Sequence, residues 1–426
     1  MSGLRPPSRS QALRLALAAA VVAGAVVLGV VLLGGSGKSR GATPPPVASN
    51  LQPVVPVHAQ AGDATAVTQS LRHKQMVVVI DHPSSSLFAE QNAAIAQGAS
   101  MAVDELNAAG GLVQHIQVKF VPQSLDGLSA AEVESRLRSE AAAALILPCD
   151  TDSQLSLATA AARYKTLMLA PCNLDPTVGE RYPTYWPIGM STSEEMAGLT
   201  SFMRTIGYGS VFIVTAPGSR YVQLVTDDFR TAAQRRQIRI DGSASIAMTT
   251  SDFSGLAHTI EAASARPSVI FTALPPPLVN QMAAGLKAQG IRQSLVGASV
   301  MDTQLTVTRN RGALEDSVFP SYGFPRESPA GHHFLASYKK RFGSEPVGSF
   351  PGLGFETIRV LEAAVHQARS AEPSAIEQAF SRGLALEGVA LAERRYHSGK
   401  DHNPIGPVAV EKDVAGHFEQ VLATTP

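Results

Sequence analysis

The chain has 426 residues, of which 45% are hydrophobic and 16% are charged, and its basic and acidic residues balance to a formal net charge of zero. This apolar content is enough for one or two sizeable cores. A nucleic-acid-binding protein would need a clustered excess of lysine and arginine, so we expect no nucleic-acid partner.

The first apolar segment runs from Leu15 to Leu33 and contains no charged residue. It is long enough to cross a bilayer as a helix. Arg5, Arg9 and Arg14 precede it, which predicts a cytoplasmic N-terminus at residues 1–14 and an extracytoplasmic remainder. We interpret the segment as an uncleaved signal anchor, with a cleavable signal peptide as the alternative. A lipoprotein is excluded because no cysteine follows the apolar run closely.

Residues 34–74 contain several glycines and prolines, including Pro44-Pro45-Pro46, and no sustained hydrophobic period. Such a segment buries too little apolar surface to offset the entropy of folding. We expect a disordered tether between the membrane and a globular part.

From Met76 onward, short apolar runs alternate with amphipathic stretches, and the pattern restarts after Gly207. The expected strands are 76–80, 116–121, 145–147, 167–170, 211–215, 243–247, 269–273 and 295–297. The expected helices are 89–108, 130–142, 153–164, 221–234, 252–264 and 278–289. Two α/β halves of this kind predict two lobes with parallel sheets, whose ligand lies at the carboxyl ends of the strands.

Four stretches of the sequence carry a resemblance to a known family. One runs from Gly331 to Glu362, where an amphipathic helix, a Phe342-Gly343 stop and a second helix follow each other. The others are 97–112, 251–253 and the ending 388–410, in which Pro407 precedes Val408-Ala409-Val410. In their order and spacing they resemble the type I extracytoplasmic solute-binding proteins of the leucine/isoleucine/valine group, the substrate-binding components of ABC transporters.

The resemblance implies an α/β, two-lobe periplasmic-binding-protein-like I fold, in which each lobe is a parallel sheet flanked by helices. Lobe 1 would comprise residues 75–190 and 322–387, and lobe 2 residues 191–321 and 388–426. Three crossovers would join the lobes, near Ile188 to Ser193, Ser321 to Phe324 and Ala385 to Val389. The implied function is capture of a small molecule between the lobes and its presentation to an ABC permease, in the periplasm and tethered to the inner membrane.

The cleft positions follow from the resemblance residue by residue. The loop after the third strand corresponds to the one that holds a ligand carboxylate in amino-acid binders, but here Asp150 stands where a serine is usual, and Leu174 replaces a second hydroxyl. Ser299 replaces the acid that pairs with the ligand ammonium, whereas Tyr221 is retained. The complete set of expected ligand contacts is Ser84, Ser85, Gln91, Asp150, Thr151, Cys172, Asn173, Thr192, Tyr221 and Ser299.

These departures indicate a ligand other than an ordinary α-amino acid, because both its charged ends lose a partner. The alternatives are a neutral amide, an aromatic or aliphatic metabolite, or a cation attracted by Asp81, Asp150 and Asp152. The loop Pro275-Pro276-Pro277 would form a rigid apolar wall and favours a less polar ligand. Asp150 has a second interpretation as a simple helix cap.

The only two cysteines, Cys149 and Cys172, both follow expected neighbouring strands. In an oxidising compartment they are candidates for a disulfide, and the alternative is two small buried thiols. No further ligand is spaced with them as a zinc site requires, so we expect no metal and no cofactor.

The sequence contains no Gly-x-Ser-x-Gly elbow, phosphate-binding loop or His-Glu-x-x-His motif, so we do not expect an enzyme. A second function class stays open. The same fold serves as a ligand sensor or as a structural scaffold for a cell-envelope or signalling partner, without transport.

Overall fold

The computed structural model describes residues 63–83, 86–125, 127–175, 177–263, 265–309, 312–323, 328–386, 388, 394–396, 402–404 and 406–424. The predicted anchor at 15–33 and the first part of the predicted tether lie outside these residues. All the described residues fall within one compact unit, 57–426. No helix among them has the length and apolar character needed to span a membrane.

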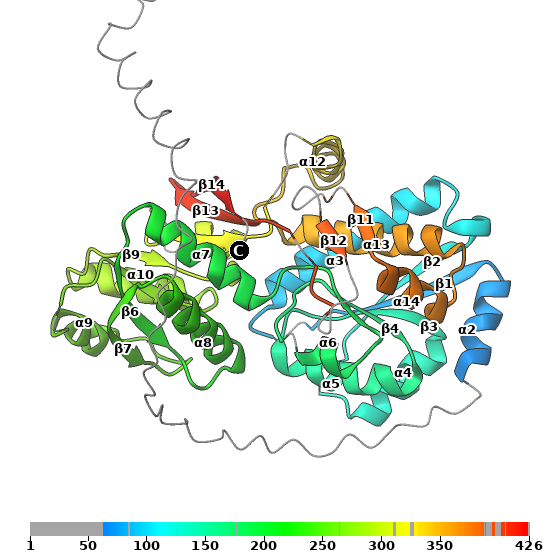
Figure 1. Ribbon diagram of the computed structural model, residues 1–426, viewed down its shortest axis with the longest axis horizontal. Coiled ribbons are helices and arrows are strands. Elements are labelled where there is room, and N and C mark those ends of the chain that lie inside the picture. Colours follow the sequence, from blue (N-terminus) through cyan, green and yellow to red (C-terminus); the bar gives the residue numbers. More distant parts are fainter. Residues whose placement is uncertain are drawn as a thin grey trace, which may run out of the picture. The chain divides into compact units, whose positions relative to one another are not determined.

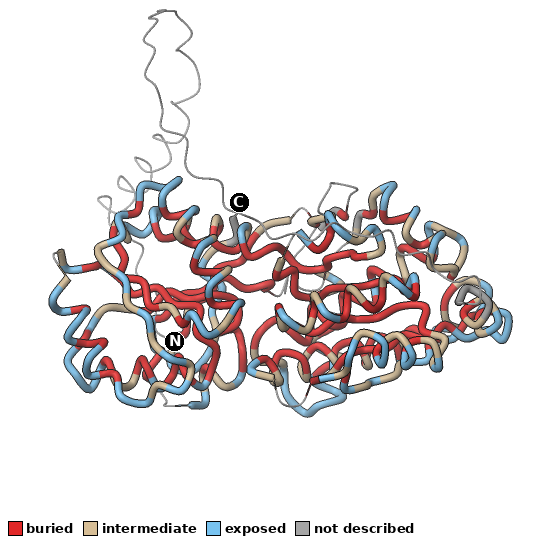
Figure 2. Tube along the Cα trace, turned by 90° about the horizontal axis from the view of Figure 1, so that it is seen from below, coloured by how far each residue is buried: buried red, intermediate tan, exposed pale blue. Residues whose placement is uncertain are grey.

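Lobe 1 is built on a parallel five-stranded sheet with the strand order β2-β1-β3-β4-β5 (Figure 1). Its strands are β1 Gln75–Asp81, β2 Gln117–Gln123, β3 Ala142–Ile146, β4 Leu167–Ala170 and β5 Tyr185–Pro187. Every residue of β3 and β4 is buried, as expected of parallel strands covered by helices on both faces. Figure 2 shows this continuous buried trace through the interior of the lobe.

The helices of lobe 1 come from two parts of the chain that lie far apart in sequence (Figure 1). The earlier part contributes α2 Asp63–Arg72, α3 Ala89–Ala108, the short η1 Val113–His115, α4 Ala130–Glu140, α5 Thr151–Tyr164 and α6 Thr177–Arg181. The later part contributes α12 Pro329–Phe342, α13 Phe350–Ala368, α14 Pro373–Arg382 and a two-stranded antiparallel sheet of β11 Leu384–Leu386 and β12 Arg394–Tyr396.

Lobe 2 is built on a seven-stranded sheet with the order β14-β13-β10-β9-β8-β6-β7. Its strands are β6 Ser210–Thr215, β7 Arg239–Ser245, β8 Val269–Thr272, β9 Ser294–Val296, β10 Val318–Ser321, β13 Val408–Val414 and β14 His417–Thr424. The first five pair in parallel, whereas β13 runs antiparallel to both β10 and β14. Its helices are α7 Thr192–Thr205, α8 Arg220–Arg235, α9 Ser254–Glu261, α10 Leu278–Ala288, η2 Ser299–Met301 and α11 Gln304–Thr308.

The two-lobe α/β fold predicted from the sequence is therefore confirmed. The helix stop at Phe342-Gly343 is also present, because Gly343 adopts a left-handed conformation with φ of 87° and ends α12. Helix α13 then packs along α3. At their crossing Gly98 faces the backbone of Pro351, and Gly354 faces the backbone of Ile95.

Part of the predicted tether is a helix. Within the expected disordered segment 34–74, helix α2 covers Asp63–Arg72 and contacts β1. Val67 and Leu71 are buried in the lobe 1 core. These two side chains lie four residues apart and share one helix face. Two apolar residues are too few to predict a helix in a segment whose composition is otherwise polar and glycine-rich.

The last passage between the lobes lies later than predicted. The first passage between the lobes follows β5, and a capping box between Ser191 and Glu194 marks the start of α7 there. The third does not fall at 385–389, because the hydroxyl of Tyr396 on β12 donates to Glu356 Oε1 of α13, 3.2 Å away. His402 Nδ1 also lies 2.7 Å from the carbonyl oxygen of Tyr185. The chain therefore returns to lobe 2 between His402 and Val408.

Candidate functional site

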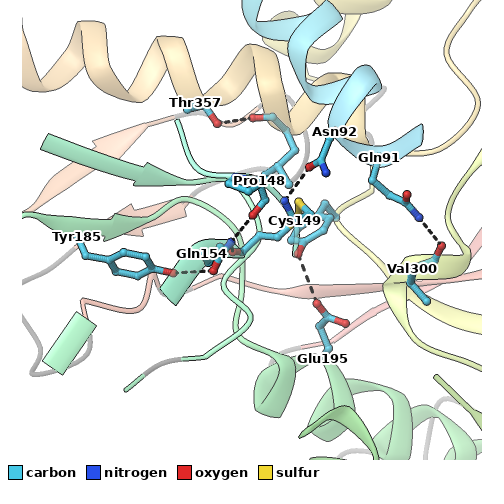
Figure 3. Close-up of a disulfide and its surroundings, with 12 residues drawn as sticks. Gln91, Asn92, Pro148, Cys149, Gln154, Tyr185, Glu195, Val300 and Thr357 are labelled. Carbon is cyan, nitrogen blue, oxygen red and sulfur yellow. Dashed lines mark hydrogen bonds between the residues drawn. A yellow bond between two sulfur atoms is a disulfide. The ribbon is translucent and has the colours of Figure 1, made fainter. Parts of the chain in front are cut away.

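A disulfide between Cys149 and Cys172 joins the two loops that follow β3 and β4, with their Cα atoms 5.3 Å apart (Figure 3). The sequence left open either a disulfide or two buried thiols at these positions, and the structure contains the disulfide. The side-chain amide of Gln154 on α5 also holds both loops, because it donates to the carbonyl oxygens of Pro148 and Cys172 at 2.7 Å. Asn92 Oδ1 of α3 accepts from the Cys149 N–H at 2.7 Å. These bonds fix one rim of the cleft.

The opposing rim comes from lobe 2 and from the second passage. Tyr221 lies in the first turn of α8, Ser299 begins η2, and Tyr322 follows β10. The hydroxyl of Tyr322 lies 3.4 Å from Glu195 Oε1 on α7. Figure 3 places Glu195 on the α7 side of the disulfide. The ring of Tyr221 meets the ring of Phe88 from lobe 1 edge-on, with centroids 5.1 Å apart.

Polar contacts join the two lobes directly. Gln91 Nε2 of α3 donates to the Val300 carbonyl oxygen at 3.1 Å, a bond visible in Figure 3. Arg220 of α8 also lies 3.2 Å from Asp175 and 4.0 Å from Asp152, both of lobe 1. These bonds therefore join the two lobes across the cleft.

Between these rims, the described residues line a cavity of about 10 Å³. That volume holds about one water molecule. Its walls are Phe88, Gln91, Cys149, Cys172, Leu174, Tyr221, Ser299, Val300, Tyr322 and Phe350. None of these residues carries a charge, and four are aromatic, so the protein's own side chains fill an apolar, neutral cleft.

Glu195 contacts the lining residues Tyr322 and Ser299 and is 1% exposed. Burial raises its pKa from 4.5 to about 8, and hydrogen bonds from Ser299 and Tyr322 oppose that rise only in part. The carboxyl group is therefore mainly protonated at pH 7. It can donate a hydrogen bond and places no full negative charge beside the cleft.

This raised pKa makes stability depend on pH. Between pH 4.5 and about 8 the folded protein holds a proton on Glu195 that the unfolded chain releases. The stabilisation is complete below pH 4.5 and is lost as the pH rises through 8, with a slope of up to about 1.4 kcal/mol per pH unit. We expect Glu195→Gln to flatten this dependence in urea unfolding curves from pH 5 to 9. The exposed Glu180→Gln is the matched control, and equal slopes in both variants would contradict the assignment.

The structure brings four of the expected contacts together at the cavity: Gln91, Cys172, Tyr221 and Ser299. Ser84 and Ser85 lie outside the described residues. Asp150 does not line the cavity; its side chain caps α5 by accepting from the Ser153 N–H at 2.9 Å, as the alternative interpretation had it. Thr192 points elsewhere, since its hydroxyl donates to Asp228 Oδ2 at 2.6 Å.

Thr151 and Asn173 are buried close to the rim but do not line the cavity. The Asn173 amide donates to Asn403 Oδ1, and the Thr151 hydroxyl has no hydrogen-bond partner among the residues that the structure describes. The prolines at 275–277 do not line it either, contrary to expectation. Pro277 is the N-cap residue of α10. Sequence reasoning missed Phe88, Tyr322 and Phe350, although Tyr322 fell inside a predicted crossover.

Two lobes with parallel sheets, three passages between them and a cleft at the carboxyl ends of the strands define a solute-binding architecture. The sequence profile of a periplasmic binding protein family matches residues 77–412. The chain therefore belongs to that family. A comparison with curated proteins finds no match.

Solved structures share the fold at low sequence identity. The branched-chain amino acid transporter substrate binding protein LivJ from Streptococcus pneumoniae, in complex with isoleucine, is 16% identical with a TM-score of 0.73 over 83% of this chain and 99% of its own. The leucine binding protein LivK from Thermotoga maritima is 17% identical, with the same TM-score and coverage. A solute binding protein of an ABC transporter from R. palustris, in complex with benzoate, is 14% identical with a TM-score of 0.69 over 83% of this chain and 96% of its own.

Proposed function

We propose that this protein captures a small, uncharged and mainly apolar solute, such as an aromatic compound with one or two polar groups. The observation that carries the proposal is the wall of the cleft, in which aromatic rings and the disulfide surround the polar groups of Gln91 and Ser299. Ligand pockets of this kind gain affinity from apolar contact and orientation from a few polar atoms. A charged ligand would find no opposite charge on these walls.

The solute enters only after the walls move, because about 10 Å³ is too little for an organic molecule. The contacts of Gln91 with Val300 and of Arg220 with Asp175 must open, or the rings of Phe88 and Tyr221 must turn aside. Binding then shifts the protein between an open and a closed arrangement. We propose that an ABC permease reads the closed arrangement, and that the segment 15–33 anchors the protein in the inner membrane.

Thermal melting of the full-length chain with a panel of neutral aromatic compounds, amides, amino acids and aromatic acids tests the proposal. A solute at a hundred times its Kd stabilises the folded state by about 2.7 kcal/mol, which raises the midpoint by a few degrees. We expect a neutral aromatic compound to give this shift and Tyr221→Ala to abolish it. Tyr208→Ala is the matched control, because Tyr208 lies in lobe 2 away from the cavity.

A partner-binding scaffold is the second candidate, and the filled cleft favours it. If no compound raises the midpoint while the chain melts cooperatively, solute capture loses its support. If only amino acids raise it, the neutral ligand class is wrong although capture stands.

A further inference from the structure

A second, much larger cavity of about 410 Å³ lies beside the cleft. Helix α3, the end of α12, the loop at 344–347 and the start of α13 enclose it from lobe 1, and residues 302–304 enclose it from lobe 2. It shares Gln91 and Phe350 with the cleft. Its walls are Glu90, Gln91, Ala93, Ala94, Gln97, Asp302, Thr303, Gln304, Tyr338, Phe342, Ser344, Glu345, Pro346, Val347, Phe350 and Pro351.

The ionisable carboxyl groups on these walls have no basic counterpart among the described lining residues. Glu90, Asp302 and Glu345 are acidic, and none of the described residues that line the cavity is a lysine, arginine or histidine. Outside the cavity walls, Lys339 Nζ lies 3.9 Å from Glu345 Oε1. Both of those side chains are well exposed, so water screens their interaction. Burial raises the pKa of Glu90 and that of Asp302, and a cation bound beside them would favour their charged forms.

Two fully buried side chains on these walls each have an acceptor oxygen for which the described part of the chain provides no donor. Asp302 is 0% exposed; its Oδ2 accepts from Ser321 Oγ at 2.7 Å and from the Ser349 N–H at 3.0 Å, whereas its Oδ1 has no partner. Gln91 is 3% exposed, and its Nε2 is used by Val300 while its Oε1 has no partner. Buried acceptors left in this state are unfavourable, and a donor placed beside them would relieve the cost.

An organic ammonium group fits these walls better than a metal ion does. No cluster of three metal-ligating side chains is present among the described residues. A primary ammonium has three donors to offer to such oxygens. The rings of Tyr338, Phe342 and Phe350 provide apolar and cation–π surface for the carbon chain that carries it.

We propose that this cavity is a second ligand site, distinct from the solute cleft, that binds a small organic cation with primary ammonium groups, of the size of a linear diamine. Glu90 of lobe 1, whose Oε1 accepts from the Leu305 N–H at 3.0 Å, and Asp302 of lobe 2 hold the cation. A cation at this site therefore contacts both lobes at once.

Isothermal titration of the full-length chain with 1,5-diaminopentane tests the proposal, and pentane-1,5-diol is the uncharged probe of matched length. We expect the diamine to bind and the diol to give no heat. Glu90→Gln should weaken diamine binding about tenfold and Glu345→Gln about threefold. Glu261→Gln, at the exposed end of α9, should leave the affinity unchanged.

Glu345 is exposed, so its replacement leaves the fold intact and keeps the test decisive even if Glu90→Gln is poorly stable. Absence of diamine binding would overturn the proposal. So would equal binding of the diol, or diamine affinity that is the same in Glu345→Gln and Glu261→Gln.

Discussion

Replacing Gly98 with alanine is expected to lower the free energy of unfolding by about 3 kcal/mol. An added Cβ would lie 1.8 Å from the carbonyl oxygen of Pro351 and 2.9 Å from the N atom of Phe355. Both are backbone atoms of α13, so no side chain can rotate aside to make room. The helices α3 and α13 must move apart instead, which opens the core of lobe 1.

Urea unfolding measures this loss, and Gly255→Ala in α9 is its control. A Cβ at Gly255 meets nothing within 4 Å, and alanine is the better helix former, so we expect that variant to be as stable as the parent or slightly more so. A Gly98→Ala protein that unfolds at the same urea concentration as Gly255→Ala would show that the two helices tolerate a methyl group at their crossing.

Removal of the disulfide, by the double substitution Cys149→Ala and Cys172→Ala, is expected to cost about 3 kcal/mol. The two cysteines are 23 residues apart, and cross-linking a loop of that size restricts the unfolded chain by about this amount. Both side chains are buried, at 3% and 2% exposure, so alanine avoids placing a polar group in the core.

Denaturation with and without dithiothreitol measures the effect. The parent should lose stability on reduction, and the double variant should be indifferent to the reductant. Because the disulfide forms part of the cleft wall, the double variant should also bind the cleft solute more weakly. A parent whose unfolding midpoint is unchanged by complete reduction would contradict the stabilising role.

Much of the fold could be predicted from hydrophobic periodicity. The predicted helix 89–108 and strand 167–170 coincide with α3 and β4, because each carries a clear helical or fully apolar pattern. Strand β7 was expected at 243–247 but covers Arg239–Ser245. It lies at the edge of its sheet, where most residues are exposed or only half-buried, so its sequence carries a weak strand signal.

The sequence predicted site residues that directly follow the ends of strands. It did not predict those that reach the site through side-chain packing. Cys149 and Cys172 could be located because loops after neighbouring parallel strands meet at one edge. Phe88, Tyr322 and Phe350 could not, because an aromatic residue in a sequence looks the same whether it fills a core or lines a cleft. The neutral state of Glu195 likewise depends on burial by segments distant in sequence.

Lobe 1 is completed by α12, α13 and α14, which follow the parallel strands of lobe 2 in the chain. During biosynthesis the chain emerges N-terminus first, so the face of α3 that receives α13 stays uncovered while lobe 2 is being made. Closing that face must wait until α13 has emerged, near Ala368. For that interval the nascent protein presents an apolar helix surface to chaperones and proteases, and the speed of translation sets how long it does so.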